Sequence, residues 1–493
     1  MVRWDLVCRG IALVVGMLLM AQPVCAQTGR AARPYRALFG GDASNQRSLH
    51  QLDLTVSLNG GVDNGLGTPV AAIPFDSSAA APDAFEQLYS AGAQLSYAMR
   101  GSRVSVAAMG STTFPYYSTF PDIRELAFGT SANVSYVTAA TSLDAMGSYA
   151  YSPFYAPALR PGSGSVLPGG SLDYASAVSP NETTSAGASF TRQFGRQTTL
   201  SLGSTLSGVM FTDEDRSDGN QRARPASSHH TTRADASLTR RFGRQTSVTA
   251  GYTHSSIVFI DEDRSNSQQS ARLAASRQLS RSVTFNGSYD YSEAGYLTSA
   301  APATSMSHGA NVGFGYNRQS SRGRTTTLGF TVGASLVDYQ QRRSQRWRGS
   351  VNFSQAISAN WSADANYSRS LQYQNALQEP VWADVVRATV GGRFGRRVNL
   401  AFAAAYSGGG QLASSSQRFD IYSGTARAQV ALADFVAITV AYVSYRYNYP
   451  AGYDLPAGVP PHMDRQRVQI GATFWLPLVR AGRAREPRSA ANQ

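Results

Sequence analysis

The chain has 493 residues, of which 42% are hydrophobic, a formal net charge of +13 and two cysteines, Cys8 and Cys25. The apolar content lies slightly below the roughly 45–50% of ordinary globular domains. After the first 26 residues no apolar run is long enough for a transmembrane helix, and no linker divides the chain. These bounds exclude a helical membrane protein and argue against a string of soluble domains.

The N-terminus reads as a secretory signal peptide over residues 1–26. Arg3 and Arg9 precede or flank an apolar run over 11–20, which is too short to span a bilayer as a helix, and small residues surround a cleavage site before Gln27. A lipoprotein anchor at Cys25 is the alternative, but the residues before it do not resemble a lipobox. The chain after cleavage has no cysteine, so we expect it to be stabilised without disulfides.

Alternation of apolar and polar residues runs through almost the whole chain. In the stretch SLTRRFGRQTSVTAGYTHS at 237–255, a period of two lies on both sides of a short turn, which is typical of a β-hairpin. Further strands are expected at 51–59, 89–97, 104–108, 132–136, 143–151, 183–208 (a hairpin), 271–277, 282–292, 310–316, 324–336, 346–354, 361–373, 384–393, 397–407, 424–433, 435–448 and 467–478. The count is about 20 strands, an even number between 16 and 20.

Connections between these strands alternate in length. Tight turns such as QFGRQ, RFGRQ and RFGRR lie at one end, and longer polar loops, notably 60–86, 152–182 and 212–228, lie at the other. This is the pattern of a transmembrane barrel with short periplasmic turns and long outer loops. An even strand number then places both termini in the periplasm.

The sequence also contains an internal repeat. Residues 191–217 match 239–265 at an offset of 48 residues, and residues 391–410 resemble the turn of that repeat. Duplicated hairpins suit a structure that grows by adding two strands at a time, whereas a sandwich core tolerates such growth less well.

Closure of the sheet in a membrane explains this composition. Lipid tolerates no unpaired backbone groups, so a sheet can enter it only as a closed barrel, which also removes aggregation-prone edges. The apolar face then meets lipid, and the Ser, Thr, Asn and Gly face encloses water. Aromatic residues near strand ends are expected to form two girdles, unless the tyrosines are simply strand formers. They are Tyr97, Tyr149, Tyr252, Tyr316, Tyr406, Tyr442, Phe194, Phe242 and Phe394.

On these features, residues 49–479 resemble the outer-membrane β-barrel proteins of Gram-negative bacteria. The resemblance is one of architecture, with an N-terminal segment at 27–48 implied to lie in the periplasm. Such barrels commonly end on an aromatic residue, whereas here Phe474 and Trp475 are followed by a basic tail at 480–493. That departure weakens the likeness to general porins and leaves room for barrels encoded with exopolysaccharide export systems. The implied partners are outer-membrane lipid, lipopolysaccharide, the barrel assembly machinery and polysaccharide export components.

Charged residues at polar positions of the strands are the candidate lumen-facing groups. They are Arg103, Arg272, Arg346, Arg348, Arg387, Arg427, Arg467, Asp53, Asp144, Asp235, Asp290 and Asp364. One interpretation is a channel with a modest preference for anions, because the guanidinium fork suits carboxylates and phosphates. The other is mutual salt bridging that holds the wall together.

Other kinds of site are weakly supported. The acidic runs Asp213–Asp215 and Asp261–Asp263 offer oxygen ligands for Ca²⁺ but lack EF-hand spacing. The pair His229 and His230 is the sole histidine spacing of interest, and no G-x-S-x-G motif accompanies the many serines. The sequence therefore predicts no catalytic residues, no metal, no cofactor and no nucleic-acid module.

The sequence predicts an outer-membrane β-barrel channel for passive passage or export of hydrophilic solutes or polymer, with exopolysaccharide as one candidate. The loops at 60–86 and 152–182 are expected to gate or narrow it. The alternative is a non-conducting structural or surface-interaction barrel. A soluble secreted β-protein is a third interpretation.

Overall fold

The structure is a computed structural model. It describes residues 48–64, 86–117, 126–155, 177–211, 228–260, 265–297, 303–319, 324–358, 360–373, 380–395, 397–411, 418–450 and 461–483. The predicted signal peptide and almost all of the segment at 27–48 lie outside these residues, as do the acidic runs Asp213–Asp215 and Asp261–Asp263. The described residues contain no helix long and apolar enough to cross a membrane.

The regular structure consists of twenty β-strands. They are β1 (Ser48–Asp63), β2 (Glu86–Arg100), β3 (Val104–Tyr117), β4 (Ala127–Val137), β5 (Thr141–Tyr155), β6 (Ala177–Phe194), β7 (Thr198–Phe211), β8 (His229–Phe242), β9 (Thr246–Phe259), β10 (Ser265–Gln278), β11 (Val283–Leu297), β12 (Ala303–Gln319), β13 (Thr325–Tyr339), β14 (Arg342–Ala356), β15 (Trp361–Tyr373), β16 (Pro380–Phe394), β17 (Val398–Gln411), β18 (Arg418–Ala433), β19 (Val436–Asn448) and β20 (His462–Arg483).

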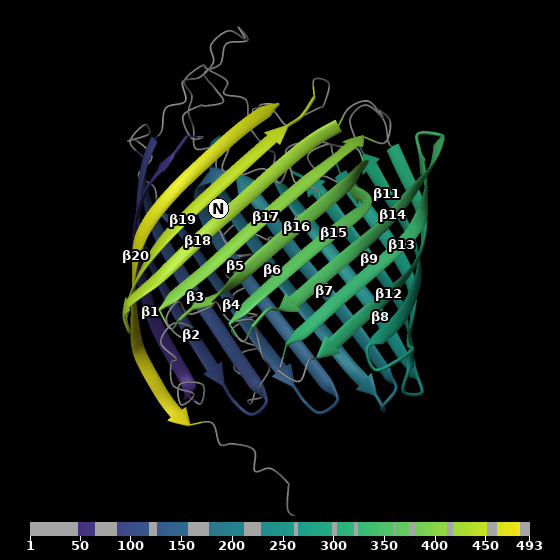
Figure 1. Ribbon diagram of the computed structural model, residues 1–493, viewed down its shortest axis with the longest axis horizontal. Helices are drawn as coiled ribbons and strands as arrows, with labels where there is room; N and C mark the ends of the chain where they lie inside the picture. Colours follow the sequence, from purple (N-terminus) through teal and green to yellow (C-terminus); the bar gives the residue numbers. More distant parts are fainter. Residues whose placement is uncertain are drawn as a thin grey trace, which may run out of the picture.

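The strands close into one ring. Each pairs antiparallel with its neighbours in sequence, and β20 pairs with β1 from Ser48↔Arg483 to Asp63↔Arg467. Figure 1 shows the resulting barrel, with the yellow β20 beside the purple β1. The prediction of an all-β, closed antiparallel barrel of about 20 strands is confirmed.

The strands are longer than the alternation alone indicates. β4 spans Ala127–Val137 where 132–136 is predicted, and β10 spans Ser265–Gln278 where 271–277 is predicted. β20 continues to Arg483, into the first residues of the predicted basic tail. Polar strand ends keep their ladder hydrogen bonds even where the hydrophobic contrast between the two faces fades, and for this reason pattern reading misses them.

Glycine fixes three of the tight turns. Gly195, Gly243 and Gly395 have φ angles of 64°, 69° and 64°, which is the left-handed region that glycine enters without steric cost. Each directly follows a phenylalanine at the end of β6, β8 or β16. The repeated F-G-R motif is thus a conformational requirement of the turn.

The opposite rim is less uniform than the loop lengths predict. Between β13 and β14 only Gln340 and Gln341 intervene, with φ angles of 47° and 62°. Two consecutive positive φ angles are the signature of a two-residue type I′ hairpin turn. The expectation that every connection at this end is long is therefore wrong here. The predicted loops 60–86 and 152–182 also shrink, since β1 runs to Asp63 and β5 to Tyr155.

The two faces of the ring differ in polarity. In a sheet, directly paired residues share a face, so the register assigns every strand position to one of two faces. One face carries exposed apolar side chains such as Leu58, Leu206 and Ile470, each more than half exposed. The other carries the polar side chains that are fully buried, including Asp63 and Arg465. Because inward-facing side chains converge in a closed ring, the polar face is the inner one.

All nine aromatic residues predicted for the girdles lie on the outer face. Phe194, Phe242 and Phe394 sit beside the tight turns and are 48%, 52% and 72% exposed. Tyr97 and Tyr316 lie toward the same end, Tyr149 and Tyr406 lie in the opposite half of their strands, and Tyr252 and Tyr442 lie near the middle of theirs. Their role in a membrane interface stays a prediction.

Candidate functional site

The inner face of the barrel is the candidate site. Eleven of the twelve charged residues selected from the sequence lie at inner positions of the strands. They are Asp53, Asp144, Asp235, Arg272, Asp290, Arg346, Arg348, Asp364, Arg387, Arg427 and Arg467. The twelfth, Arg103, lies one residue before β3, beside a tight turn. The register places these side chains on one surface without bringing them into a single cluster.

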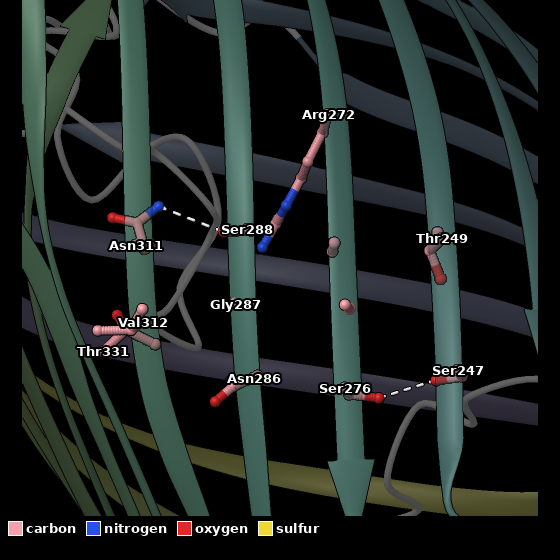
Figure 2. Close-up of a pocket in the computed structure, with 12 residues that line it drawn as sticks. Ser247, Thr249, Arg272, Ser276, Asn286, Gly287, Ser288, Asn311, Val312 and Thr331 are labelled. Atoms are coloured by element: carbon pink, nitrogen blue, oxygen red, sulfur yellow. Dashed lines mark hydrogen bonds between the residues drawn. The ribbon is translucent and has the colours of Figure 1, made fainter.

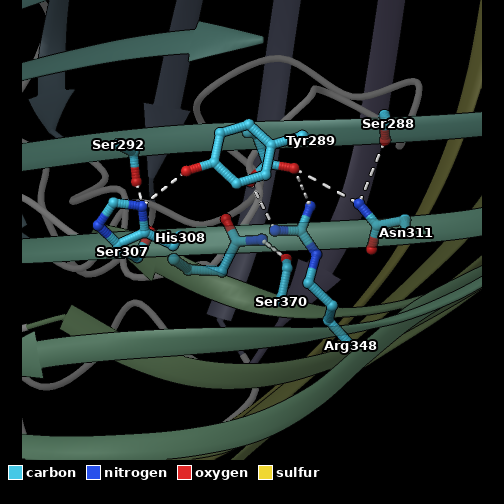
Figure 3. A network of polar contacts seen from close by, with 10 residues as sticks. Ser288, Tyr289, Ser292, Ser307, His308, Asn311, Arg348 and Ser370 are labelled. Atoms are coloured by element: carbon cyan, nitrogen blue, oxygen red, sulfur yellow. Dashed lines mark hydrogen bonds and ion pairs between the residues drawn. The ribbon is translucent and has the colours of Figure 1, made fainter. Parts of the chain in front are cut away.

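One ion pair spans three neighbouring strand gaps of this face. Arg348 of β14 donates from Nη1 and Nη2 to the two carboxylate oxygens of Asp290 on β11, at 2.6 and 2.9 Å. The register pairs Asp290 with Gly309, and Arg348 with Gly333. The Arg348 side chain therefore crosses β13 and β12 to reach its partner, and Figure 3 shows it within the surrounding polar network, near Asn311.

Glycine makes this crossing possible. A Cβ added to Gly309 would overlap the guanidinium of Arg348, and one added to Gly333 would overlap the backbone oxygen of Ala310. With both side chains absent, Arg348 lies along the wall instead of projecting across the barrel. The side chains of Arg348 and Asp290 are 23% and 21% exposed.

Hydroxyl and amide groups continue the network around this pair. The Asn311 amide donates to Ser288 at 3.3 Å and to Asp290 at 3.4 Å, while the hydroxyls of Thr331 and Ser350 lie 2.8 Å apart. We call the inner face of β9–β14 the polar wall. Its small, hydrogen-bonded side chains leave donors and acceptors toward the interior.

A depression of about 230 Å³ lies in the polar wall, over β9–β13 (Figure 2). Its lining comprises Ser247, Thr249, Arg272, Ala274, Ala275, Ser276, Asn286, Gly287, Ser288, Asn311, Val312 and Thr331. Arg272 pairs in register with Asp290, whose oxygens are taken by Arg348 and Asn311. Among the residues that the structure describes, the Arg272 side chain forms no hydrogen bond or ion pair, so no other residue neutralises its charge.

A second depression of about 300 Å³ begins at the edge of the polar wall and lies over β13–β16. It contains Asp364 and Arg387 together with Asn352, Asn366 and Thr389. The Asn366 amide donates to the Asn352 side chain across β14 and β15. This depression has both signs of charge, so it favours no single ion.

The buried ion pair at the barrel seam was missed by sequence reasoning. Arg465 of β20 donates from Nε and Nη2 to Asp63 of β1, at 2.9 and 2.6 Å, with side chains 2% and 0% exposed. Arg465 and Asp63 lie an even number of residues from the predicted Arg467 and Asp53, so the period of two already indicated that they face the interior. Their contact joins residues 402 positions apart, which only ring closure brings together.

A second feature missed from the sequence is apolar. Eight inner-face residues of β16, β18 and β19 and the residue after β19 are buried to 5% exposure or less. They form the apolar patch: Val381, Ala383, Val385, Phe419, Ile421, Tyr445, Tyr447 and Tyr449. The expectation of a uniformly hydrophilic inner face is therefore wrong at this end of these strands.

The histidines do not form a metal site within the described strands. His229 and His230 are adjacent in β8 and point to opposite faces of the sheet. His308 lies on the outer face, where its ring nitrogen and the Tyr289 hydroxyl are 2.8 Å apart. Among the described residues no group of three or more His, Cys, Asp or Glu side chains could hold an ion.

Comparison with known proteins gives similarity of fold only. No family model matches the chain, and no curated protein matches it. Among solved structures, the ferric enterobactin receptor PfeA of Pseudomonas aeruginosa, a mutant form, aligns at 9% identity with a TM-score of 0.44, covering 87% of this chain and 81% of the receptor.

Two further structures align at the same level. OccAB3 of Acinetobacter baumannii aligns at 12% identity with a TM-score of 0.37, and OpdQ of P. aeruginosa at 12% with 0.38; each alignment covers 87% of this chain and 99% of the other. At such identities and scores these likenesses carry no argument about solute or mechanism.

Proposed function

We propose that this chain is an outer-membrane channel through which hydrophilic solutes pass passively. The observation that carries the proposal is the opposition of the two faces around a closed ring, with apolar side chains outside and the polar wall inside. Closure leaves no strand edge unpaired, which is the condition for a sheet to enter lipid. The outer face then contacts acyl chains, and the inner face is solvated.

The polar wall suits a permeation path. Its ion pair lies flat over Gly309 and Gly333, and the depression beside it presents Arg272 with serine, threonine and asparagine groups. Such a surface exchanges hydrogen bonds with hydroxylated or carboxylated solutes without holding them tightly, as conduction requires. Arg272 gives this stretch a modest preference for anions.

The orientation follows from the two rims. Tight turns belong on the periplasmic side and the longer connections outside, which puts the ends of β1 and β20 that lead to the termini in the periplasm. Exopolysaccharide is one polymer that a polar wall of this kind would suit.

Bilayer recordings test the proposal. Purified protein should give a stable open level, and R346A/R348A should shift the reversal potential in a salt gradient toward cations. The substitution removes two inner positive charges and leaves the Asp290 carboxylate unpaired. R192A/R240A, at outer-face arginines near the tight turns, should leave the reversal potential unchanged. An unchanged reversal potential in R346A/R348A would contradict permeation along this wall.

A structural or surface-interaction barrel is the second candidate, and the apolar patch favours it. Buried phenylalanine and tyrosine side chains on an inner face are suited to packing, not to water. If the apolar patch belongs to a filled interior, recordings should show no stable open level in wild-type protein.

A further inference from the structure

A charged cluster lies on the outer, otherwise apolar face. Arg369 of β15 donates from Nη1 to both oxygens of Asp384 on β16 at 3.3 Å, and the Tyr367 hydroxyl donates to Asp384 at 2.9 Å. The Arg369 guanidinium also lies 4.2 Å from the ring centroid of Trp347. Besides their ion pair, Arg369 thus contacts Trp347, and Asp384 accepts a hydrogen bond from Tyr367. The side chains of Arg369 and Asp384 are 23% and 16% exposed.

The cluster continues across β17 to β18. Arg418 donates to the Tyr406 hydroxyl at 3.0 Å, and that hydroxyl donates to Asp420 at 2.7 Å. The Arg418 guanidinium lies 3.9 Å from Asp384 and 3.8 Å from Asp420. Gly408 stands between the two carboxylates in the register, and a Cβ there would overlap the Tyr406 hydroxyl. The glycine therefore leaves the room that the network occupies.

Together Trp347, Arg369, Asp384, Tyr406, Arg418 and Asp420 are the outer cluster. It lies toward the rim of longer connections, since β15 ends at Tyr373, β16 begins at Pro380 and β18 begins at Arg418. Charges on the lipid-facing side of a barrel are costly at mid-depth and nearly free of cost at the headgroup level. The outer cluster thus marks the depth at which lipid headgroups begin.

The opposite end of the outer face is built differently. There Arg192 lies over Phe194 at 5.2 Å and Arg240 over Phe242 at 5.3 Å, with no hydrogen bond to a carboxylate among the described residues. The two rims therefore offer different chemistry to the two leaflets. Among the residues that the structure describes, only the rim of longer connections combines guanidinium donors, carboxylate acceptors and an aromatic ring on the outer face.

This combination identifies a class of ligand. The Arg418 side chain is 57% exposed, and a guanidinium fork binds phosphate oxygens in a bidentate manner. Asp420, 35% exposed, accepts hydrogen bonds from hydroxyl groups. A ligand that supplies both phosphate oxygens and sugar hydroxyls contacts both groups, whereas a phosphodiester headgroup without hydroxyl groups adds no donor to the one that Tyr406 already gives Asp420.

We propose that the outer cluster binds the phosphorylated sugar headgroup of a glycolipid in the surrounding leaflet. Arg418 and Arg369 contact the phosphate, Asp420 accepts from a sugar hydroxyl, and Trp347 supports Arg369 from below. This inference rests on the proposed outer-membrane location, but not on conduction through the barrel.

Binding to detergent-solubilised full-length protein tests the site. Rough lipopolysaccharide, its enzymatically dephosphorylated form and phosphatidylmethanol, an anionic phosphodiester lipid without a headgroup hydroxyl, are titrated, and lipid adducts are counted by native mass spectrometry. Wild-type protein should prefer phosphorylated lipopolysaccharide, and R369A/R418A should lose about tenfold or more in apparent affinity, as expected when charge-assisted hydrogen bonds are removed. R192A/R240A is the matched control and should bind as wild type does.

Equal affinity of wild type and R369A/R418A, or equal binding of the dephosphorylated lipid, would overturn the proposal. So would a lipid-independent dimer that dissociates on substitution, because the cluster would then be a contact between copies. Heat-modifiable gel mobility checks folding, and R418Q tests the site with a smaller change. Recordings on the same samples separate the two proposals: binding without conductance defeats only the channel, and conductance without binding defeats only the lipid site.

Discussion

Two stretches of the inner face show what the same alternating pattern can build. The polar wall of β9–β14 has small hydroxyl and amide side chains, an ion pair laid over glycines and a depression open to the interior. The apolar patch of β16, β18 and β19 has aromatic and branched side chains, with Val381, Phe419 and Ala383 fully buried. One stretch is organised for exchange with water and the other for packing. Inward orientation alone therefore does not decide whether a residue is solvated.

The largest loss of stability is expected at the seam between β1 and β20, where Asp63 and Arg465 form a buried ion pair. R465A leaves Asp63 buried without its bidentate partner and should destabilise the fold by about 3–5 kcal/mol. Urea titration followed by heat-modifiable gel mobility measures the loss. R343A removes a pair whose side chains are 68% and 45% exposed and should cost less than about 1 kcal/mol. Equal losses in the two variants would show that the seam pair is not structural.

Truncation within the apolar patch should come next. F419A removes a fully buried ring that stacks on Tyr449 at 5.4 Å and should cost about 3 kcal/mol. The same urea titration applies, with F314A on the exposed outer face as the control, where a smaller loss is expected in detergent. If F419A behaves like F314A, the apolar patch is not packed in solution and the contrast between the two stretches fails.

A smaller effect should follow from filling the path of Arg348. G309V places a side chain where the guanidinium crosses, so Arg348 should leave Asp290 at a cost of about 1–2 kcal/mol. G391V is the matched inner-face control, because a Cβ at Gly391 meets its nearest atom at 3.5 Å. The reversal potential should change in G309V and stay fixed in G391V. Identical stability and reversal potential in both would mean that the ion pair does not depend on glycine.

The smallest effect on stability is expected at Arg272. This side chain has no partner among the described residues, so R272A should change the free energy of unfolding by less than about 0.5 kcal/mol. Its effect should appear in permeation, as lower anion selectivity in bilayer recordings. A clear loss of stability would show that Arg272 holds the wall together, which is the salt-bridging interpretation of these charges.

Alternation made the barrel and the strand number predictable, because a period of two is local and persists through each strand. The two-residue turn at Gln340 and Gln341 was not predictable, since neither residue is the glycine or asparagine that usually marks such a turn. The contacts Asp63–Arg465 and Asp290–Arg348 depend on ring closure and on a path over glycines. Neither contact can be predicted from the spacing of residues within one strand.

The apolar patch was not predicted from the sequence, for a different reason. Along β16 the inner Val381 and Val385 alternate with the outer Trp382 and Val386, so apart from the outer Asp384 both faces are apolar and the period of two has little contrast. With so little contrast, the sequence does not show that the inner residues of this strand are apolar. A strand that is apolar on both faces is the signal to look for.

The repeated hairpins bear on how the circumference of this protein is set. β6–β7 and β8–β9 share their F-G-R-Q-T turn, and β10 meets β9 at Leu273↔Ala250, a position that corresponds in the repeat to Leu202 of β7. If one repeat unit were removed, β10 could therefore pair with β7 in place of β9, with the same residues facing inward. The ring would be two strands narrower, yet every remaining residue would keep its inside or outside position, so the circumference of the barrel can change by whole hairpin repeats.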